Sequence, residues 1–211
     1  MENKSIDEAV SHLSTAAQLQ PNDAETRFNL GVLLVGQGRL DEAVAQYTRA
    51  AQLQPNDAKI PYNLGVTVAR QGKLDEAVKY LAKAIQIQPD YTEAYVNLGV
   101  MLARQKKMNE AIGCLMKAVE LQPDHAIAQY NLAMALALSG RHVEAIDHWV
   151  RVRQLDPGNI GAVLNLASSY DKAGQRDKAI SLLQRALDAA RAAGNDQAAR
   201  QITERLKSIS N

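Results

Sequence analysis

Prolines recur in this chain at a fixed interval of 34 residues, and this spacing constrains the fold more than any other feature. Five of the six prolines follow the interval: Pro21, Pro55, Pro89, Pro123 and Pro157. A period of about 20 to 50 residues is typical of a chain that stacks copies of one supersecondary unit. Each unit of such a chain buries its apolar face only against its neighbours. The spacing therefore predicts a repeat array.

Small and large side chains also keep fixed places within the period. When the units begin at residues 24, 58, 92, 126 and 160, the eighth place is always Gly or Ala. The twentieth place is always alanine, at Ala43, Ala77, Ala111, Ala145 and Ala179. The twenty-fourth place is always large, at Tyr47, Leu81, Leu115, Trp149 and Leu183. Because small residues let two helices approach closely and a large one fills the remaining gap, each unit is predicted to be a packed helical pair.

Glycine-containing breaks near the middle of most units separate the two helices, as at Gln37-Gly38. Each helix has about 13 residues and is about 20 Å long. We call the first helix of a unit helix A and the second helix B. The periodic proline ends helix B because it cannot continue the hydrogen-bond ladder. Pro61, outside the period, is expected in the first turn of its helix A, where it does no harm.

This pattern resembles the tetratricopeptide repeat family, in which small residues at places 8, 20 and 27 accompany a proline at place 32. The resemblance covers nearly the whole chain and implies an all-α fold, a right-handed solenoid of antiparallel helix pairs. Two features depart from the family. Lys106 replaces the turn glycine of the third unit. The fourth place, often tryptophan in the family, is Arg27, Pro61, Tyr95, Gln129 and Val163.

The resemblance also divides the chain. Complete repeats are expected at 24–57, 58–91, 92–125, 126–159 and 160–193, with a capping helix in 194–211 that runs from about Gln197 to Ile209. Residues 7–21 align with 41–55 without a gap, so residues 1–23 are expected to be a half repeat with helix B alone. Two interpretations of this start remain open: a fragment of a longer array, or a lone helix that caps the array. Arg191 stands where the last periodic proline is expected.

Composition excludes several classes of function. Lys and Arg number 24 against 23 Asp and Glu, which leaves no charge excess for nucleic acid or an anionic membrane. The longest apolar run, 132–138, is far shorter than the roughly 20 residues of a membrane helix. One cysteine excludes an internal disulfide. We expect no nucleic-acid partner, no membrane span and, because no signal peptide is visible, a cytoplasmic location.

Motifs for catalysis are missing from the sequence. There is no glycine-rich phosphate loop, and the four histidines lack metal-binding spacing on one helix face. Cys114 is expected to be a partly buried, inert thiol. Carboxylate pairs such as Asp41-Glu42 recur at the start of helix B, where they favour the positive end of the helix dipole. We therefore expect no enzyme activity, no cofactor and no metal.

A row of basic residues on helix B has two interpretations. It occupies place 26 of the units at Arg49, Lys83, Lys117, Arg151 and Arg185, with Thr15 in the half repeat. Such a row is usually a solvated face. The alternative is a docking strip for an acidic surface.

In the tetratricopeptide family, helix A lines the inner, concave groove of the superhelix. Its sixth place is here always asparagine: Asn29, Asn63, Asn97, Asn131 and Asn165. An amide offers donors and an acceptor, so a row of them can hold a peptide main chain of almost any sequence. The row is similar to the asparagine ladder in the repeats of O-linked N-acetylglucosamine transferases. The alternative is that these amides brace neighbouring repeats, and both interpretations remain open.

The groove is also expected to be apolar. A helix that is apolar on all sides requires burial on all sides, and helix B covers only one. The expected strip, on places 5 and 9 of helix A, is Phe28, Val32, Tyr62, Val66, Val96, Val100, Tyr130 and Met134. Apart from the asparagine, the residues of the family's carboxylate clamp for acidic chaperone tails are not present. The alternative is a groove merely lined by small valines and alanines.

These features predict a non-catalytic scaffold that binds a peptide or an amphipathic helix in its concave groove. One alternative is a structural homo-oligomer, assembled through the groove or the open N-terminal repeat. Another is the repeat part of a larger enzyme such as a glycosyltransferase. Whether the groove binds a peptide or another copy of the chain, something apolar is expected to cover the groove or the open N-terminal helix.

Overall fold

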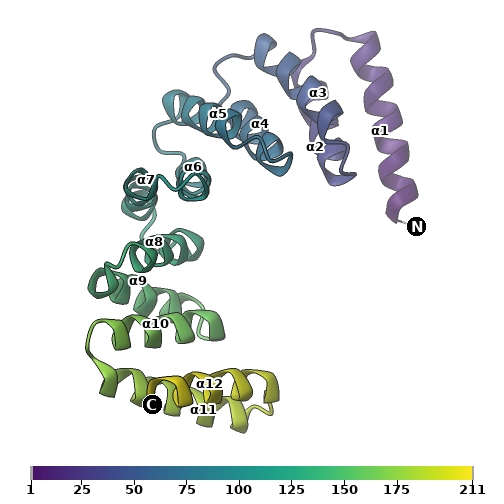
Figure 1. Ribbon diagram of the computed structural model, residues 1–211. Coiled ribbons are helices and arrows are strands. Elements are labelled where there is room, and N and C mark those ends of the chain that lie inside the picture. The colour runs from purple at the N-terminus through teal and green to yellow at the C-terminus, as the bar shows by residue number, and fades with distance from the viewer. Residues whose placement is uncertain (1, 211) are drawn as a thin grey trace. The chain divides into compact units, whose positions relative to one another are not determined.

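The computed structural model describes residues 2–210, and within that range the chain consists of helices without strands (Figure 1). The prediction of an all-α fold is confirmed. The helices are α1 (Glu2–Leu19), α2 (Ala24–Gly36), α3 (Leu40–Leu53), α4 (Lys59–Arg70), α5 (Leu74–Ile87), α6 (Thr92–Arg104), α7 (Met108–Leu121), α8 (Ala126–Leu138), α9 (His142–Leu155), α10 (Ile160–Lys172), α11 (Arg176–Ala192) and α12 (Asp196–Ser210).

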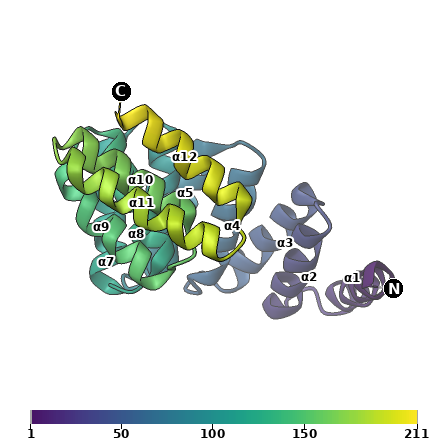
Figure 2. The same ribbon diagram turned by 90° about the horizontal axis from the view of Figure 1, so that it is seen from below.

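The chain folds as two compact units, an N-terminal unit (Met1–Lys107) and a C-terminal unit (Met108–Asn211). In the N-terminal unit, α2 packs on α3 and α4 packs on α5, and each helix also packs on the next along the chain. The C-terminal unit repeats this arrangement, with α8 on α9, α10 on α11, and α12 against α11 (Figure 2). We keep the 34-residue division given above as our proposal for the repeat boundaries.

The small residues of helix A do allow a close approach to helix B. A Cβ atom placed on Gly31 would lie 2.6 Å from Cε1 of Tyr47, and one on Gly65 would lie 2.8 Å from Cγ of Leu81. Such distances are far below van der Waals contact, so a larger side chain at either position requires Tyr47 or Leu81 to shift or the helices to separate. The large residues are correspondingly buried: Tyr47 is 1% exposed and Leu81 0%. This interlocking of small and large side chains holds α2 to α3 and α4 to α5.

Helix ends follow the sequence signals, with one informative exception. Pro61 lies buried in the first turn of α4, as expected. α3, α5, α7 and α9 each have 14 residues, whereas α11 has 17 and ends at Ala192. Arg191 stands where a proline would have ended α11 earlier, so the helix continues for one more turn. The last helix begins at Asp196, one residue before the expected start.

The turn between helices A and B needs a left-handed residue, and Lys106 supplies it without being glycine. Gly38, Gly72, Gly140 and Gly174 have φ between 75° and 82°, and Lys106 has φ of 64°. Lys106 therefore adopts the same left-handed conformation as the glycines. Its cost is steric, because a Cβ atom in this region approaches the following carbonyl oxygen.

Arg27 and Gln129, the polar residues at the fourth place, bind the loop between two successive repeats in the same way. Nε of Arg27 donates to the carbonyl oxygen of Pro21 at 2.9 Å, and its Nη1 donates to Oε1 of Gln46 at 3.1 Å. Nε2 of Gln129 likewise donates to the carbonyl oxygen of Pro123 at 2.7 Å, and its Oε1 lies 2.7 Å from Nδ1 of His148. Each polar side chain thus joins helix A to the preceding proline loop and to helix B. These two substitutions for the family tryptophan have a structural role.

Candidate peptide-binding face

The five asparagines of the sixth place lie on the surface of their helices. We call this surface the asparagine face; it comprises α2, α4 and α6 in the N-terminal unit and, separately, α8 and α10 in the C-terminal unit. Asn29 is exposed and the other four are half-buried. Nδ2 of Asn63 donates to the carbonyl oxygen of Lys59 at 2.8 Å, one turn earlier in its own helix. Nδ2 of Asn131 donates in the same way to Ile127.

Asn97 makes an additional bond to the preceding helix A. Its Nδ2 donates to the carbonyl oxygen of Glu93 and to the hydroxyl of Tyr62, both at 3.0 Å. The sequence left open whether the asparagines brace neighbouring repeats, and the bond from Asn97 to Tyr62 is such a bracing contact. Oδ1 of Asn97 has no hydrogen-bond partner among residues 2–210. Bracing and peptide binding are compatible at Asn97, because they use different atoms of one amide.

The aromatic residues expected in the groove are half-buried and pack against other rings. Phe28 contacts Tyr47 with ring centroids 5.5 Å apart. Tyr62 contacts Tyr91 at 4.9 Å, and Tyr130 contacts Trp149 edge-on at 5.0 Å. Burial raises the pKa of Tyr62, so its hydroxyl stays protonated over the physiological range. At these three positions, the fifth place of helix A therefore contributes mainly to packing.

The expected apolar strip is interrupted at α6. Val96 is only 5% exposed and lies in the core, so its side chain is not offered to a ligand. Its helix carries seven buried residues within 13, and place 5 turns inward there. The other members keep some surface: Val32 is 43% exposed, while Val66, Val100 and Met134 are half-buried. The strip consists of separate apolar patches.

The largest exposed apolar side chains on helix A lie on α8, and the sequence analysis missed them. Ile127 is 62% exposed and Leu138 is 68% exposed. They flank Asn131 and Met134 at spacings of 4, 3 and 4 residues, which places all four on one face of the helix. The signal was visible: α8 is apolar almost all round, at places 2 and 13 as well as at place 9.

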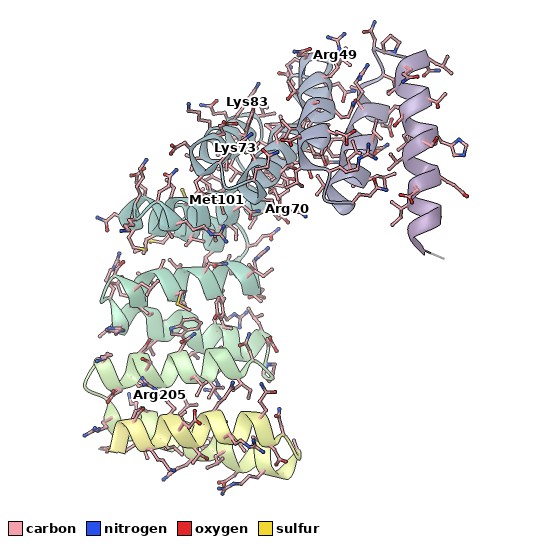
Figure 3. All side chains as sticks on the ribbon, turned by 45° about the vertical axis from the view of Figure 1, so that its right-hand side comes forward. Arg49, Arg70, Lys73, Lys83, Met101 and Arg205 are labelled. Carbon is pink, nitrogen blue, oxygen red and sulfur yellow. The ribbon has the colours of Figure 1, made fainter. Side chains whose placement is uncertain are left out.

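A pocket of about 180 Å³ opens on the asparagine face between α4 and α6. Two of its lining residues, Val66 and Asn97, were expected from the sequence, and the rest were not. In Figure 3, Arg70 and Met101 lie toward one edge of the N-terminal unit, and Arg49 and Lys83 lie toward the opposite edge. The lining residues are Val66, Ala69, Arg70, Leu81, Asn97, Met101 and Arg104.

The helix B basic row is partly engaged within the fold. Nη2 of Arg49 donates to Oδ1 of Asn22 at 3.3 Å, in the loop one unit earlier. Arg151 makes the equivalent ion pair with Asp124. Lys117 pairs with Glu120 at 2.9 Å. Arg49 and Arg151 thus brace successive repeats, whereas the Lys117 pair stays within α7.

Chemical groups for catalysis do not cluster in the described part of the chain. No group of three or more His, Cys, Asp or Glu side chains is placed to hold a metal ion among residues 2–210. Cys114 is half-buried, and burial raises the pKa of its thiol, which disfavours the nucleophilic thiolate. In the same range, no helix has the length and apolar character needed to cross a bilayer.

Comparison with known proteins gives consistent relatives. Models of the tetratricopeptide repeat match residues 1–58, 33–92 and 62–115, residues 90–156, and residues 136–206. No curated protein sequence matches the chain. Among solved structures, the MamA protein has a TM-score of 0.74 and 26% identity, over 80% of this chain and 92% of its own.

Two further structures extend the comparison. YrrB, described as a TPR protein with an unusual peptide-binding site, has a TM-score of 0.74 and 25% identity, over 91% of this chain and 97% of its own. PilF of Pseudomonas aeruginosa has a TM-score of 0.76 at 20% identity, over 96% of this chain and 91% of its own. The likeness to PilF concerns the fold alone. All three structures have a helical architecture similar to that of this chain.

Proposed function

Because the chain belongs to the tetratricopeptide repeat family, we propose that it is a non-catalytic scaffold that binds an extended peptide or an amphipathic helix on its asparagine face. The family and its structural neighbours support a protein-interaction scaffold. The choice of this face, and of a peptide as ligand, rests on the side chains described above. YrrB supports the choice of ligand only by its own description as a peptide binder.

One observation carries the proposal: an asparagine stands at the same place of every helix A, with acceptor capacity left over. Asn63, Asn97 and Asn131 each use Nδ2 within the fold. None of their Oδ1 atoms has a hydrogen-bond partner among residues 2–210. Within one unit, carbonyl acceptors on neighbouring helices A, such as those of Asn63 on α4 and Asn97 on α6, suit the N–H groups of a peptide main chain, which are present in any sequence except at proline.

The exposed apolar side chains on α8 support an apolar component of binding. Ile127 and Leu138 lie on either side of Asn131, so one helix offers an acceptor between two apolar contacts. Apolar surface gathered on one face commonly marks an interaction site. An amphipathic helix satisfies this arrangement as well as an extended peptide does, because both present apolar side chains at regular intervals.

A displayed library of random twelve-residue peptides tests the proposal. The full chain is immobilised, bound peptides are selected, and the affinity of a synthetic, fluorescently labelled peptide is measured by anisotropy. We expect Asn131→Ala to weaken binding at least fivefold, which corresponds to the loss of about one hydrogen bond. Asn109→Ala, an equivalent change on the exposed start of α7, is the matched control and should leave the affinity unchanged.

Light scattering over a concentration series distinguishes the alternative of self-assembly. A second copy bound at the asparagine face would produce a dimer that the selected peptide displaces. A strictly monomeric chain that selects no peptide would contradict both forms of the proposal.

A further inference from the structure

The pocket between α4 and α6 has an apolar floor. Leu81, from helix α5, is 0% exposed at the bottom, and Met101 is 6% exposed. Val66 and Ala69 form the apolar wall on α4. The volume is about 180 Å³, and an apolar cavity of about 150 Å³ is large enough to bind benzene. The pocket therefore accepts one branched aliphatic side chain, which would leave water on entering it.

Two arginines at the rim give the pocket a positive charge. Arg70 and Arg104 occupy the same place of successive helices A, and both are exposed. Nη1 of Arg70 donates to the carbonyl oxygen of Val35 at 3.2 Å, and neither arginine forms an ion pair within residues 2–210. The planar guanidinium matches a carboxylate in shape and charge.

The nearby acidic residues are engaged with amides instead of with these arginines. Oδ1 of Asp41 accepts from Nε2 of Gln71 at 2.9 Å, and Oδ1 of Asp75 accepts from Nε2 of Gln105 at 2.8 Å. Glu93 lies in the first turn of α6, eleven residues before Arg104 at the other end of the helix. Among residues 2–210 no carboxylate forms an ion pair with Arg70 or Arg104, so both guanidinium groups can pair with an anionic ligand.

Asn97 can offer a ligand only a hydrogen-bond acceptor. Because Nδ2 is bound to Tyr62 and Glu93, only Oδ1 remains, and it can only accept. The pocket therefore combines one acceptor for a main-chain N–H, an apolar hole, and guanidinium donors for an anion. A peptide residue with an aliphatic side chain and a neighbouring carboxylate meets all three requirements.

This combination occurs once among the described helices. The place of Arg70 and Arg104 is held by Gly36 in α2, Leu138 in α8 and Lys172 in α10. Asn29 and Asn63 continue the asparagine face on α2 and α4, so a peptide can run from α2 across α4 to the pocket. We assign the anion to a side-chain carboxylate next to the aliphatic residue, and a terminal carboxylate is the outcome that the test below distinguishes.

From these contacts we infer that the pocket between α4 and α6 selects a branched aliphatic residue next to an aspartate or glutamate in the bound peptide. The inference rests on the proposed function and adds the chemistry of the partner. Its test is a parallel selection, with the same twelve-residue library, on the parent chain, on Arg104→Glu and on Lys83→Glu. Arg104 makes no hydrogen bond described in the fold, and Lys83 supplies an equivalent charge change at the opposite edge (Figure 3).

The parent and Lys83→Glu should enrich aliphatic–acidic pairs, and Arg104→Glu should enrich aliphatic residues next to Lys or Arg. A selected acidic peptide should bind Arg104→Glu at least tenfold more weakly than the parent, with Arg104→Lys retaining part of the affinity. Ala69→Leu, which fills the pocket, should remove the preference for the aliphatic residue. Melting curves of each variant confirm that the fold is retained.

The outcomes separate this inference from the proposed function. Peptides that bind without a charge preference, yet lose affinity in Asn131→Ala, leave the function standing and overturn the inference. If synthetic peptides bind only with a free carboxyl terminus, the assignment of the anion to an aspartate or glutamate side chain is overturned. A library that yields no binder overturns both.

Discussion

The two units stack their helices with different polar contacts. In the N-terminal unit, a glutamine at the end of each helix A donates to an aspartate thirty residues earlier: Gln37 to Asp7, Gln71 to Asp41 and Gln105 to Asp75, at 2.6 to 2.9 Å. In the C-terminal unit the corresponding pairs are Ser139 with Asn109, and Ala173 with Val143. Oγ of Ser139 bonds its own helix at Ala135, and Val143 is 65% exposed. The stacking survives without this bond.

The asparagine face also differs between the two units. The N-terminal unit carries Arg70 and Arg104 beside an apolar pocket, and the C-terminal unit carries the exposed Ile127 and Leu138. The places that repeat, small and large, are alike in both units because they form the core. The places that distinguish the two units here are on the surface, as at Arg70, Arg104, Ile127 and Leu138. One repeat framework thus carries two different surfaces, a pocket beside two arginines in the N-terminal unit and exposed apolar side chains in the C-terminal unit.

The largest effect is expected where the framework is most crowded. Gly65→Leu should lower the free energy of unfolding by about 1–3 kcal/mol, because a Cβ atom at this position would lie 2.8 Å from Cγ of Leu81 and 3.2 Å from the carbonyl oxygen of Ala77. Gly113→Leu is the matched control, since nothing lies within 4 Å of its Cβ. Chemical denaturation monitored by circular dichroism compares the two. Equal melting of Gly65→Leu and the parent would show that the repeat register is wrong.

Asparagine substitutions should separate stability from binding. Asn97→Ala removes the bond to Tyr62 and should cost about 1 kcal/mol, whereas Asn131→Ala loses only a bond to its own helix. Alanine also favours the helix more than asparagine does, so Asn131→Ala should melt within a few degrees of the parent. Both variants should bind the selected peptide more weakly. Losses of stability that parallel the losses of affinity would favour bracing as the role of both residues.

Lys106 offers a gain of stability. Lys106→Gly should raise the free energy of unfolding by about 0.5–1 kcal/mol, because glycine adopts a φ of 64° without a Cβ clash. Lys107→Gly, next to it in the same turn, is the control and should not stabilise. Thermal melting of the three proteins decides the matter, and an unstabilised Lys106→Gly would mean that the surrounding turn already relieves the strain.

The glutamine–aspartate pairs should each contribute less, because they are largely exposed. A double-mutant cycle on Gln71→Ala and Asp41→Ala should give a coupling of about 0.5 kcal/mol. The same cycle on Ser139 and Asn109 should give no coupling. A coupling of equal size in both units would remove this difference between them.

The smallest expected effect is a pH dependence confined to the C-terminal unit. Burial lowers the pKa of His148 below its ordinary value of 6.5, against the opposing pull of Asp147 and Glu144. As the pH falls through 6.5, His148 takes up a proton more readily in the unfolded chain than in the folded one. The stability contributed by the neutral ring is therefore complete above pH 6.5 and is lost as the pH falls below it. The melting temperature should fall more between about pH 7.5 and 5.5 for the parent than for His148→Gln. Its counterpart in the N-terminal unit, Gln46, does not titrate.

How far the sequence predicts the molecule depends on whether a residue repeats. The 34-residue period predicted the helical pairs and the close approach at Gly65, because core places are constrained in every copy. The period did not reveal the pocket, because arginine stands at this place in only two of the five repeats, at Arg70 and Arg104. The strip was wrongly extended through Val96, because place 5 turns into the core at α6. Which face of an apolar helix is covered depends on its neighbours, and periodicity alone does not specify that.

Methyl NMR of the full chain with a selected peptide tests the central claim most directly. Ile127, Leu138 and Val32 are exposed methyl groups on helix A, while Val143 and Met116 are comparably exposed on helix B. If the asparagine face is the binding surface, the methyl signals of the first three should shift on titration and those of the last two should not. Shifts confined to Val143 and Met116 would place the ligand on the opposite helices and contradict the account.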